Sequence, residues 1–208
     1  MDRIVRHTGP DRTIHWIIAA SVLTLLGTAF LPILGVKFAW VTAHWIAGFV
    51  LAAIVLVHIV RALFWQDLRL VRIDLRDFRD AAAAARMTLR LGGARPGKAG
   101  KYSLAQKFIH LAFTVVILVA IGTGAIMMVK VDTPWWDRNP YWLTDANWGI
   151  VYVLHGLAAL FLVTMVIAHV YFALRPEKWQ FMRSMILGWI TRKEYQDQHD
   201  PSRWQVKE

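Results

Sequence analysis

The 208-residue chain contains no cysteine. This absence excludes disulfide bonds, cysteine-ligated iron–sulfur clusters and the C-x-x-C-H attachment of c-type haem. Charged residues are also scarce, at 18% of the chain, below the roughly 25% that is usual in soluble domains, whereas 57% of the residues are hydrophobic. Any metal centre in this chain must therefore use other ligands, and any iron–sulfur cluster must belong to a partner.

What the chain does contain is long apolar runs, near residues 14–34, 38–65, 108–129 and 151–174. A helix that spans a bilayer needs about 20 apolar residues, and a soluble domain of this size has no need for four such runs. The residues before the first run lack the apolar core of a signal peptide. We therefore predict an all-α membrane protein, a bundle of four transmembrane helices.

Basic residues gather on one side of these predicted helices. Three arginines precede the first run, nine Lys or Arg lie in 66–104 and seven lie in 175–208, whereas the two remaining loops hold only Lys37, Lys130 and Arg138. The positive-inside rule then places the N- and C-termini in the cytoplasm. The net charge of +10 is explained by this topology, so we expect no nucleic-acid partner.

The same pattern predicts the domain organisation. We expect a cytoplasmic N-terminal tail over 1–13, a transmembrane domain over 14–174 interrupted by the cytoplasmic segment 66–104, and a cytoplasmic C-terminal tail over 175–208. Residues 74–90 have an Ala-rich middle that favours a peripheral helix, followed by a glycine-rich turn over 92–100. Residues 177–193 interleave apolar and basic side chains, which predicts a peripheral amphipathic helix in contact with membrane lipid.

Two histidines, His155 and His169, lie inside the last apolar run. Fourteen residues of helix separate them by about 21 Å along the axis and return to nearly the same face. Ionisable side chains inside a membrane are costly and usually have a function, and imidazole is a common axial ligand of haem iron. This spacing predicts one helix that holds two b-type haems, one above the other.

Each haem needs a second imidazole from another helix. At the outer level His44 and His155 are the only candidates, because the other histidines lie near the cytoplasmic side or in the tails. The spacing of His44 and His58 repeats that of His155 and His169, so spacing alone slightly favours His58 at the inner level. The alternative for any single histidine is a hydrogen bond to a neighbouring helix. The candidate inner partners of His169 are His15, His58 and His110.

Two glycines lie close to the outer histidines. Gly48 follows His44 by one turn, and Gly156 directly follows His155. A flat macrocycle requires close approach of the backbone, which glycine permits. Ordinary packing of small residues between helices is the alternative explanation.

Four motifs together indicate a family. They are D-R-T-I-H-W over 11–16, His44 with a glycine one turn on, G-K-Y-S-L-A-Q-K over 100–107, and H-x13-H over 155–169. In order and spacing, from Arg3 to about Trp204, the chain resembles the gamma subunit, the cytochrome b, of membrane-bound formate dehydrogenase. The H-x13-H pair is also similar to other diheme cytochromes, including the b subunits of nickel–iron hydrogenases.

The resemblance implies two haem b groups in a multi-pass protein of the bacterial cytoplasmic (inner) membrane. It implies that His44 and His155 bind the outer haem iron and that His15 and His169 bind the inner one, with His58 as the alternative to His15. Electrons would come from an iron–sulfur subunit and a molybdenum- or tungsten-containing catalytic subunit. Formate oxidation itself would belong to that partner, and a trimer of heterotrimers would be the higher assembly.

The resemblance also implies a quinone site near the inner haem, for menaquinone or ubiquinone. At residues 103 and 105 the family pattern has Asn and Gly, so the pocket of this chain differs from that pattern. His110 is a candidate to deliver protons, because an imidazole titrates near neutral pH. An interfacial histidine without that role is the alternative. The residues implied in quinone binding are Ser103, Ala105, Gln106 and His169, with His110 beside them.

Three other functions remain open from the sequence. The same cytochrome could serve a nickel–iron hydrogenase or another periplasmic oxidoreductase, which the co-purifying metal subunit would distinguish. A stand-alone transmembrane diheme reductase would be active without partners. A haem-free membrane anchor or transporter would be colourless.

Overall fold

The computed structural model describes residues 2–92 and 97–206. The chain divides into two compact units, each with its own internal packing. We call Thr13–Val60 with Ala112–Val170 the helical unit, and Met1–Arg12 with Arg61–Leu111 and Tyr171–Glu208 the terminal unit.

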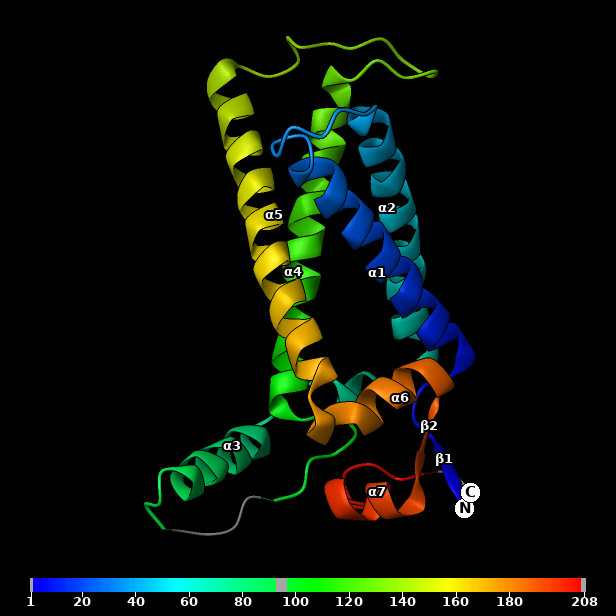
Figure 1. Cartoon of the computed structure of the whole chain (residues 1–208), viewed down its shortest axis with the longest axis vertical. Helices are drawn as coiled ribbons and strands as arrows, with labels where there is room; N and C mark the ends of the chain where they lie inside the picture. The colour runs from blue at the N-terminus through cyan, green and yellow to red at the C-terminus, as the bar shows by residue number, and fades with distance from the viewer. Residues whose placement is uncertain (1, 93–96, 207–208) are drawn as a thin grey trace. The chain divides into compact units, whose positions relative to one another are not determined.

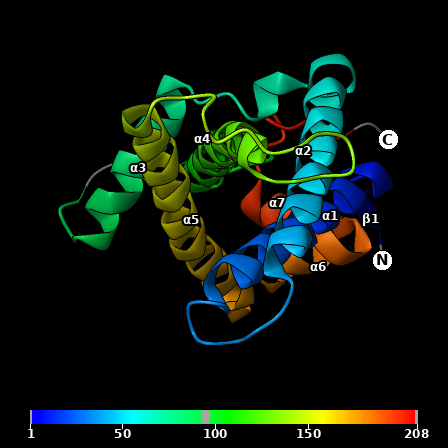
Figure 2. The ribbon, with the colours of Figure 1, turned by 90° about the horizontal axis from the view of Figure 1, so that it is seen from above.

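Four long helices supply the helical unit: α1 (Gly9–Phe30), α2 (Trp40–Trp65), α4 (Leu104–Met127) and α5 (Asp145–Leu174). All four are long and apolar enough to cross a membrane, as the apolar runs predict. α4 lies between α5 and α2 in both views of the ribbon (Figures 1 and 2). The four-helix membrane architecture is thereby confirmed.

The four helices meet through one buried apolar cluster. Each contributes one buried residue to it: Val22 from α1, Leu51 from α2, Ile117 from α4 and Leu162 from α5. Large apolar side chains elsewhere on these helices face outward; Phe161, for example, is 59% exposed. Such outward apolar surface is what a lipid environment covers, since intrahelical hydrogen bonds already satisfy the backbone.

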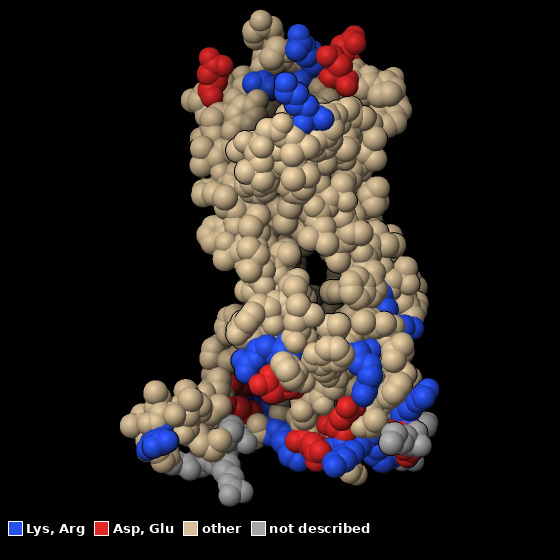
Figure 3. Space-filling model, viewed as in Figure 1, with Lys and Arg blue, Asp and Glu red and all other residues tan. Residues whose placement is uncertain are grey.

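Charge is confined to the loop end of the helical unit. Within its residues the only Lys, Arg, Asp or Glu lie in 37 and 130–145, and Figure 3 shows these blue and red groups gathered beyond an uncharged surface. Aromatic side chains pack at the same end, where the Trp135 ring lies 6.0 Å from Trp45 and 6.3 Å from Phe49. An aromatic belt beside charged loops is typical of a membrane–water interface.

The terminal unit brings both ends of the chain together. Strand β1 (Arg3–Val5) pairs antiparallel with β2 (Trp189–Thr191), in a register that places Ile4 opposite Ile190. These two isoleucines pack with Tyr195 and Trp204 in a small buried core. The unit also contains α3 (Leu75–Thr88), α6 (Trp179–Leu187), α7 (Arg192–Gln198) and short 3₁₀ helices at Leu68–Leu70 and Pro176–Lys178.

The C-terminal segment differs from the single amphipathic helix predicted over 177–193. Helix α6 ends at Leu187, and the next residue, Gly188, caps it with a φ of 91° in the left-handed region that suits glycine. The backbone amides of Arg6 and His7 donate to the Gly188 carbonyl at 2.8 and 3.1 Å. The N-terminal strand therefore interrupts the apolar pattern and converts the end of the predicted helix into β2 and α7.

The segment between α2 and α4 contains helix α3, within the predicted range 74–90. Asp74 caps it, accepting from the Asp77 amide at 3.0 Å while Asp77 Oδ2 accepts from the Asp74 amide at 3.0 Å. This reciprocal capping box explains why the helix begins where it does. The turn predicted over 92–100 includes residues 93–96, which lie outside the described residues.

Candidate functional site

The helical unit brings the predicted outer pair of histidines together. His44 on α2 and His155 on α5 have ring centroids 6.2 Å apart, with their planes inclined by 68°. Both side chains are half-buried. Two helices that are distant in the sequence thus present imidazoles to each other at the loop end of this unit.

A second pair lies on the same helix α5, fourteen residues further on. His169 faces His15 of α1, with ring centroids 6.4 Å apart. Trp16 and Phe113 border this pair edge-on, at 5.3 Å from His15 and 5.7 Å from His169. His15, one of the three candidate inner partners, thus lies beside His169.

The spacing within both pairs fits a shared metal atom. An imidazole nitrogen binds a first-row metal at about 2.0 Å and the ring centroid lies about 1.1 Å behind it, so two imidazoles on opposite sides of one iron have centroids about 6.2 Å apart. A direct N–H···N hydrogen bond about 2.9 Å long would bring the centroids to only about 5.1 Å. The measured 6.2 and 6.4 Å match the first arrangement.

Comparison with known proteins agrees with this geometry. Residues 6–188 match the family described as prokaryotic cytochrome b561. The chain belongs to that family. As a cytochrome b of four membrane-spanning helices, it is a multi-pass membrane protein that binds haem b.

Curated relatives of this cytochrome cover nearly its whole length. It is similar to the formate dehydrogenase cytochrome b556 subunit of Haemophilus influenzae, with 26% identity over 99% of this chain and 84% of the relative. It is also similar to the cytochrome b556(fdo) subunit of formate dehydrogenase from Escherichia coli K12, with 25% identity over 98% of this chain and 92% of the relative. The resemblance drawn from the motifs is thereby confirmed.

Glycines of the cytochrome leave room beside the outer pair. A Cβ added to Gly124 of α4 would lie 3.3 Å from Cε1 of His155, so a side chain there would press on the imidazole. A Cβ on Gly48 or Gly156 would meet no heavy atom within 4 Å. Tight packing between helices, the alternative explanation, therefore does not account for Gly48 and Gly156, and space for a flat macrocycle beside them stays a prediction.

Two threonines complete the outer level, and nothing in the sequence analysis singled them out. Thr28 of α1 lies 2.8 Å from Nδ1 of His44, measured from its hydroxyl oxygen. Thr123 of α4 lies at the same 2.8 Å from Nδ1 of His155. Each imidazole thus has a hydroxyl on its Nδ1 side, which leaves Nε2 as the nitrogen available to a metal.

The residues predicted for a quinone lie at the start of α4, in the terminal unit. Ser103 and Gln106 form a reciprocal cap: the Ser103 amide donates to Gln106 Oε1 at 2.9 Å, and the Gln106 amide donates to Ser103 Oγ at 3.4 Å. Ala105 and His110 are exposed. His169 belongs to the helical unit. The S-x-x-Q pattern is a capping box, so both polar side chains have a structural task.

The G-K-Y segment before α4 is held by both ends of the chain. His199 Nδ1 donates to the Gly100 carbonyl at 2.6 Å, and Arg6 donates to the Lys101 carbonyl at 2.7 Å. Arg6 Nη1 also lies 2.7 Å from Nε2 of His199, which accepts because its other nitrogen is the donor. The three chain segments therefore form one buried hydrogen-bonded clasp.

Burial shifts the pKa values of the side chains in and beside this clasp. It lowers the pKa of Arg6 to about 10 and raises the pKa of Tyr102 to about 12, so both keep their usual charge at neutral pH. Burial likewise lowers the pKa of His199, which keeps its imidazole neutral and able to accept from Arg6. The sequence alone does not indicate this role of His199, because its partners lie 99 and 193 residues away.

The D-R pair of the first motif is also structural. Asp11 accepts from the Thr8 backbone amide at 3.2 Å, which caps the start of α1. It also accepts from the Thr8 hydroxyl at 2.6 Å and from Arg61 Nε at 3.0 Å. Arg12 Nη1 donates to the Ile186 carbonyl at 2.5 Å. These bonds tie the beginning of α1 into the terminal unit.

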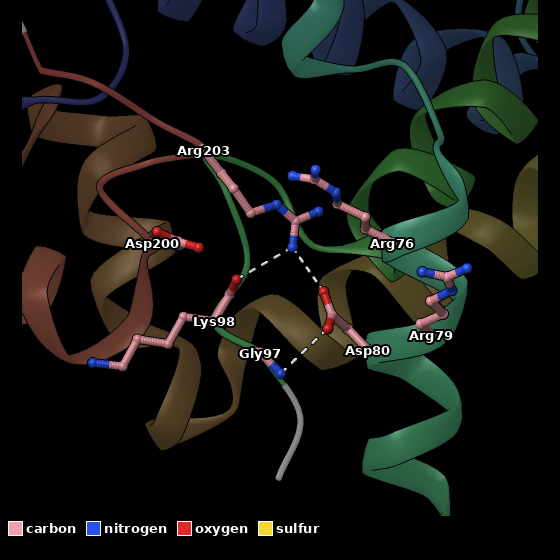
Figure 4. Close-up of a pocket in the computed structure, with 7 residues that line it drawn as sticks. All are labelled: Arg76, Arg79, Asp80, Gly97, Lys98, Asp200 and Arg203. Carbon is pink, nitrogen blue, oxygen red and sulfur yellow. Dashed lines mark hydrogen bonds and ion pairs between the residues drawn. The ribbon is translucent and has the colours of Figure 1, made fainter. Parts of the chain in front are cut away.

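A hollow of about 200 Å³ in the terminal unit is lined by charged side chains (Figure 4). Several of its polar groups are already engaged: Arg203 Nη1 donates to Asp80 Oδ2 at 2.7 Å, and the Lys98 ammonium donates to the Gln196 carbonyl at 2.6 Å. The Gly97 amide donates to Asp80 Oδ1 at 3.3 Å. We assign this hollow a structural role, as the place where α3 is joined to the C-terminal tail.

Proposed function

We propose that this cytochrome is the membrane subunit of a formate dehydrogenase and conducts electrons to a membrane quinone through two b haems. The observation that carries the proposal is the pair of imidazole sites in the helical unit, each with the spacing of two ligands on one iron. The printed names of the full-length relatives supply the choice of formate dehydrogenase.

In this proposal His44 and His155 hold the outer haem, and His15 and His169 hold the inner one. His15 is preferred to His58 because its ring lies 6.4 Å from that of His169. His58 is then a half-buried polar neighbour on α2. Since α5 carries one ligand of each pair fourteen residues apart, its helical rise sets the two levels about 21 Å apart.

The chain's own residues hold, space and shield the cofactors. Bound haems would supply reversible one-electron chemistry at the two levels. The imidazoles fix the position of each site, and the buried cluster of Val22, Leu51, Ile117 and Leu162 keeps water from the space between the levels. The outer site is kept clear of side chains by three glycines: Gly48, Gly124 and Gly156.

The proposed orientation places both termini in the cytoplasm of a bacterial cell, with the chain in the inner membrane. It rests on the basic residues of the terminal unit and on the aromatic, sparsely charged loops of the helical unit. An iron–sulfur subunit and a molybdenum- or tungsten-containing catalytic subunit would then deliver electrons from the outer side. A trimer of such heterotrimers remains a prediction of the resemblance.

Membranes that contain the whole complex test the choice of donor. Formate should reduce both b haems within the mixing time of a spectrophotometer, whereas hydrogen should not. The His169→Ala variant should keep formate reduction of the outer haem, and the His44→Ala variant should lose it for both. Reduction by hydrogen instead of formate would assign the chain to a hydrogenase and overturn the formate proposal.

The proposed electron acceptor is menaquinone or ubiquinone. It would bind near four residues of the terminal unit: Ser103, Ala105, Gln106 and His110. His169 keeps its proposed role as a ligand of the inner haem. The amide nitrogen of Gln106 is its remaining donor, because Oε1 is the acceptor of the cap. Gln106→Glu keeps a cap acceptor and removes that donor.

This matched substitution separates the two roles of Gln106. Reduced cytochrome with Gln106→Glu should pass electrons to an added quinone analogue about tenfold more slowly than wild type, with unchanged thermal stability. The His110→Ala variant tests proton delivery by the same assay. Unchanged oxidation rates in Gln106→Glu would limit Gln106 to capping α4.

A further inference from the structure

The two threonines beside the outer histidines are placed alike on different helices. Thr28 on α1 contacts His44 on α2, and Thr123 on α4 contacts His155 on α5. In each case the threonine Oγ1 lies 2.8 Å from the histidine Nδ1. The arrangement therefore occurs twice, once for each imidazole of the outer pair. The aromatic rings of Trp16 and Phe113 border the inner pair.

Each threonine hydroxyl also contacts carbonyl groups of its own helix. Thr28 Oγ1 lies 2.8 Å from the Thr24 carbonyl and 3.0 Å from that of Leu25. Thr123 Oγ1 lies 2.6 Å from the Val119 carbonyl and 3.2 Å from that of Ala120. A hydroxyl has one hydrogen and a carbonyl can only accept, so the hydrogen of each threonine points into its own helix.

The direction of the bond to histidine follows from this. With its hydrogen committed, the threonine oxygen can only accept, so Nδ1 of His44 and of His155 must be the protonated nitrogen. A neutral imidazole protonated on Nδ1 keeps a free lone pair on Nε2.

We infer that Thr28 and Thr123 are positioning residues that hold His44 and His155 in the Nδ1–H tautomer, with Nε2 turned to the outer haem iron. The inference rests on the proposed function, because it takes these two histidines as ligands. An acceptor on Nδ1–H orients a ligating imidazole and raises its basicity. A more basic ligand stabilises ferric iron, so the two threonines lower the reduction potential of the outer haem.

Hydrogen bonds from threonine to its own helix are common in membrane helices and do not by themselves indicate a role. Thr164 of α5 shows the ordinary case, with its hydroxyl donating to the Leu160 carbonyl at 3.1 Å. Thr28 and Thr123 differ from it by the added contact to an imidazole nitrogen. Thr164→Val is therefore a matched control within the same unit.

The test uses the purified full-length cytochrome with its haems, in the variants Thr28→Val, Thr123→Val, Thr28→Ser, Thr123→Ser and Thr164→Val. Valine has the shape of threonine without the hydroxyl, and serine restores it. Haem content, the two midpoint potentials from optical redox titration, and the electron paramagnetic resonance of the low-spin ferric haems are measured for each.

We expect each valine variant to move one midpoint potential to a more positive value and to change one of the two ferric resonances. The other haem, the serine variants and Thr164→Val should match wild type. Removing such an outer partner typically weakens metal binding about 10- to 100-fold, so faster loss of that haem to apomyoglobin should accompany the shift.

Three results would overturn the inference. One is a valine variant with full haem content, unchanged potentials and unchanged resonances. The second is a serine variant as impaired as the valine variant, because this would indicate a packing role. The third is an equal effect in Thr164→Val. Wild-type protein without haem would instead overturn the proposed function on which the inference rests.

Discussion

Alanine in place of Asp77 removes a carboxylate that two cations of the terminal unit share. Asp77 Oδ2 lies 2.7 Å from the Lys107 ammonium, and Oδ1 lies 2.7 Å from Nη2 of Arg203. The side chains of Asp77 and Lys107 are only 4% and 7% exposed. Burial raises the pKa of Asp77, but the hydrogen bond and charge of Lys107 and the charge of Arg203 outweigh it and leave that pKa below its usual value.

The expected cost follows from this burial. Removing one member of a buried ion pair leaves the other charge unsolvated, which typically costs about 3–5 kcal/mol of unfolding free energy. Asp80 is the internal comparison: it also pairs with Arg203 at 2.7 Å, but its side chain is 32% exposed. Asp80→Ala should therefore cost no more than about 1 kcal/mol. The double variant Asp77→Ala with Lys107→Met removes both buried charges and should recover much of the loss.

Hydrogen exchange reports the local stability of each peptide. It is measured by mass spectrometry on the detergent-solubilised protein. Peptides covering α3 (Leu75–Thr88) and the start of α4 should exchange at least about 30-fold faster in Asp77→Ala than in Asp80→Ala, as the difference of at least about 2 kcal/mol requires. Equal exchange in the two variants would refute the argument. So would a double variant that is less stable than Asp77→Ala alone.

Three further predictions concern other parts of the structure. Burial lowers the pKa of His199, so the unfolded chain binds more protons than the folded one just below the usual imidazole pKa of about 6.5. The terminal unit should therefore lose stability as pH falls below about 6.5. Limited proteolysis at pH 7.5 and 5.5 measures this, and a pH effect that persists in His199→Gln would contradict it. Gly124→Val should reduce the haem-to-protein ratio, because a side chain there presses on His155, whereas Gly122→Val, where a Cβ meets nothing within 4 Å, should leave that ratio unchanged. Thr191→Ala removes the N-cap of α7 and should cost about 1 kcal/mol in thermal unfolding, and an unchanged melting temperature would show that the cap is dispensable.

The transmembrane helices could be predicted from the sequence because length and apolar composition alone identify them. The structure places four such helices within a few residues of the apolar runs. The pairing of His44 with His155 was also predictable, since only these two histidines share the outer level. His15 and His58 could not be separated by spacing, because spacing along one helix does not specify which face of another helix it meets.

Other features depend on tertiary contacts that a periodic pattern cannot reveal. Thr28 and Thr123 look like ordinary residues of apolar helices, and only their distance from an imidazole distinguishes them. The clasp around Gly100 requires Arg6 and His199 from opposite ends of the chain. Helix α6 ends early because the N-terminal strand pairs with the residues after Gly188.

The proposed function requires that the helical unit holds two haems between two pairs of histidines. A pyridine-haem assay combined with a reduced-minus-oxidised spectrum of the purified wild-type chain, and of His15→Ala and His58→Ala, tests it most directly. We predict two b haems per wild-type chain, one in His15→Ala and two in His58→Ala. Wild-type protein without haem, or loss of a haem in His58→Ala with both retained in His15→Ala, would contradict the claim.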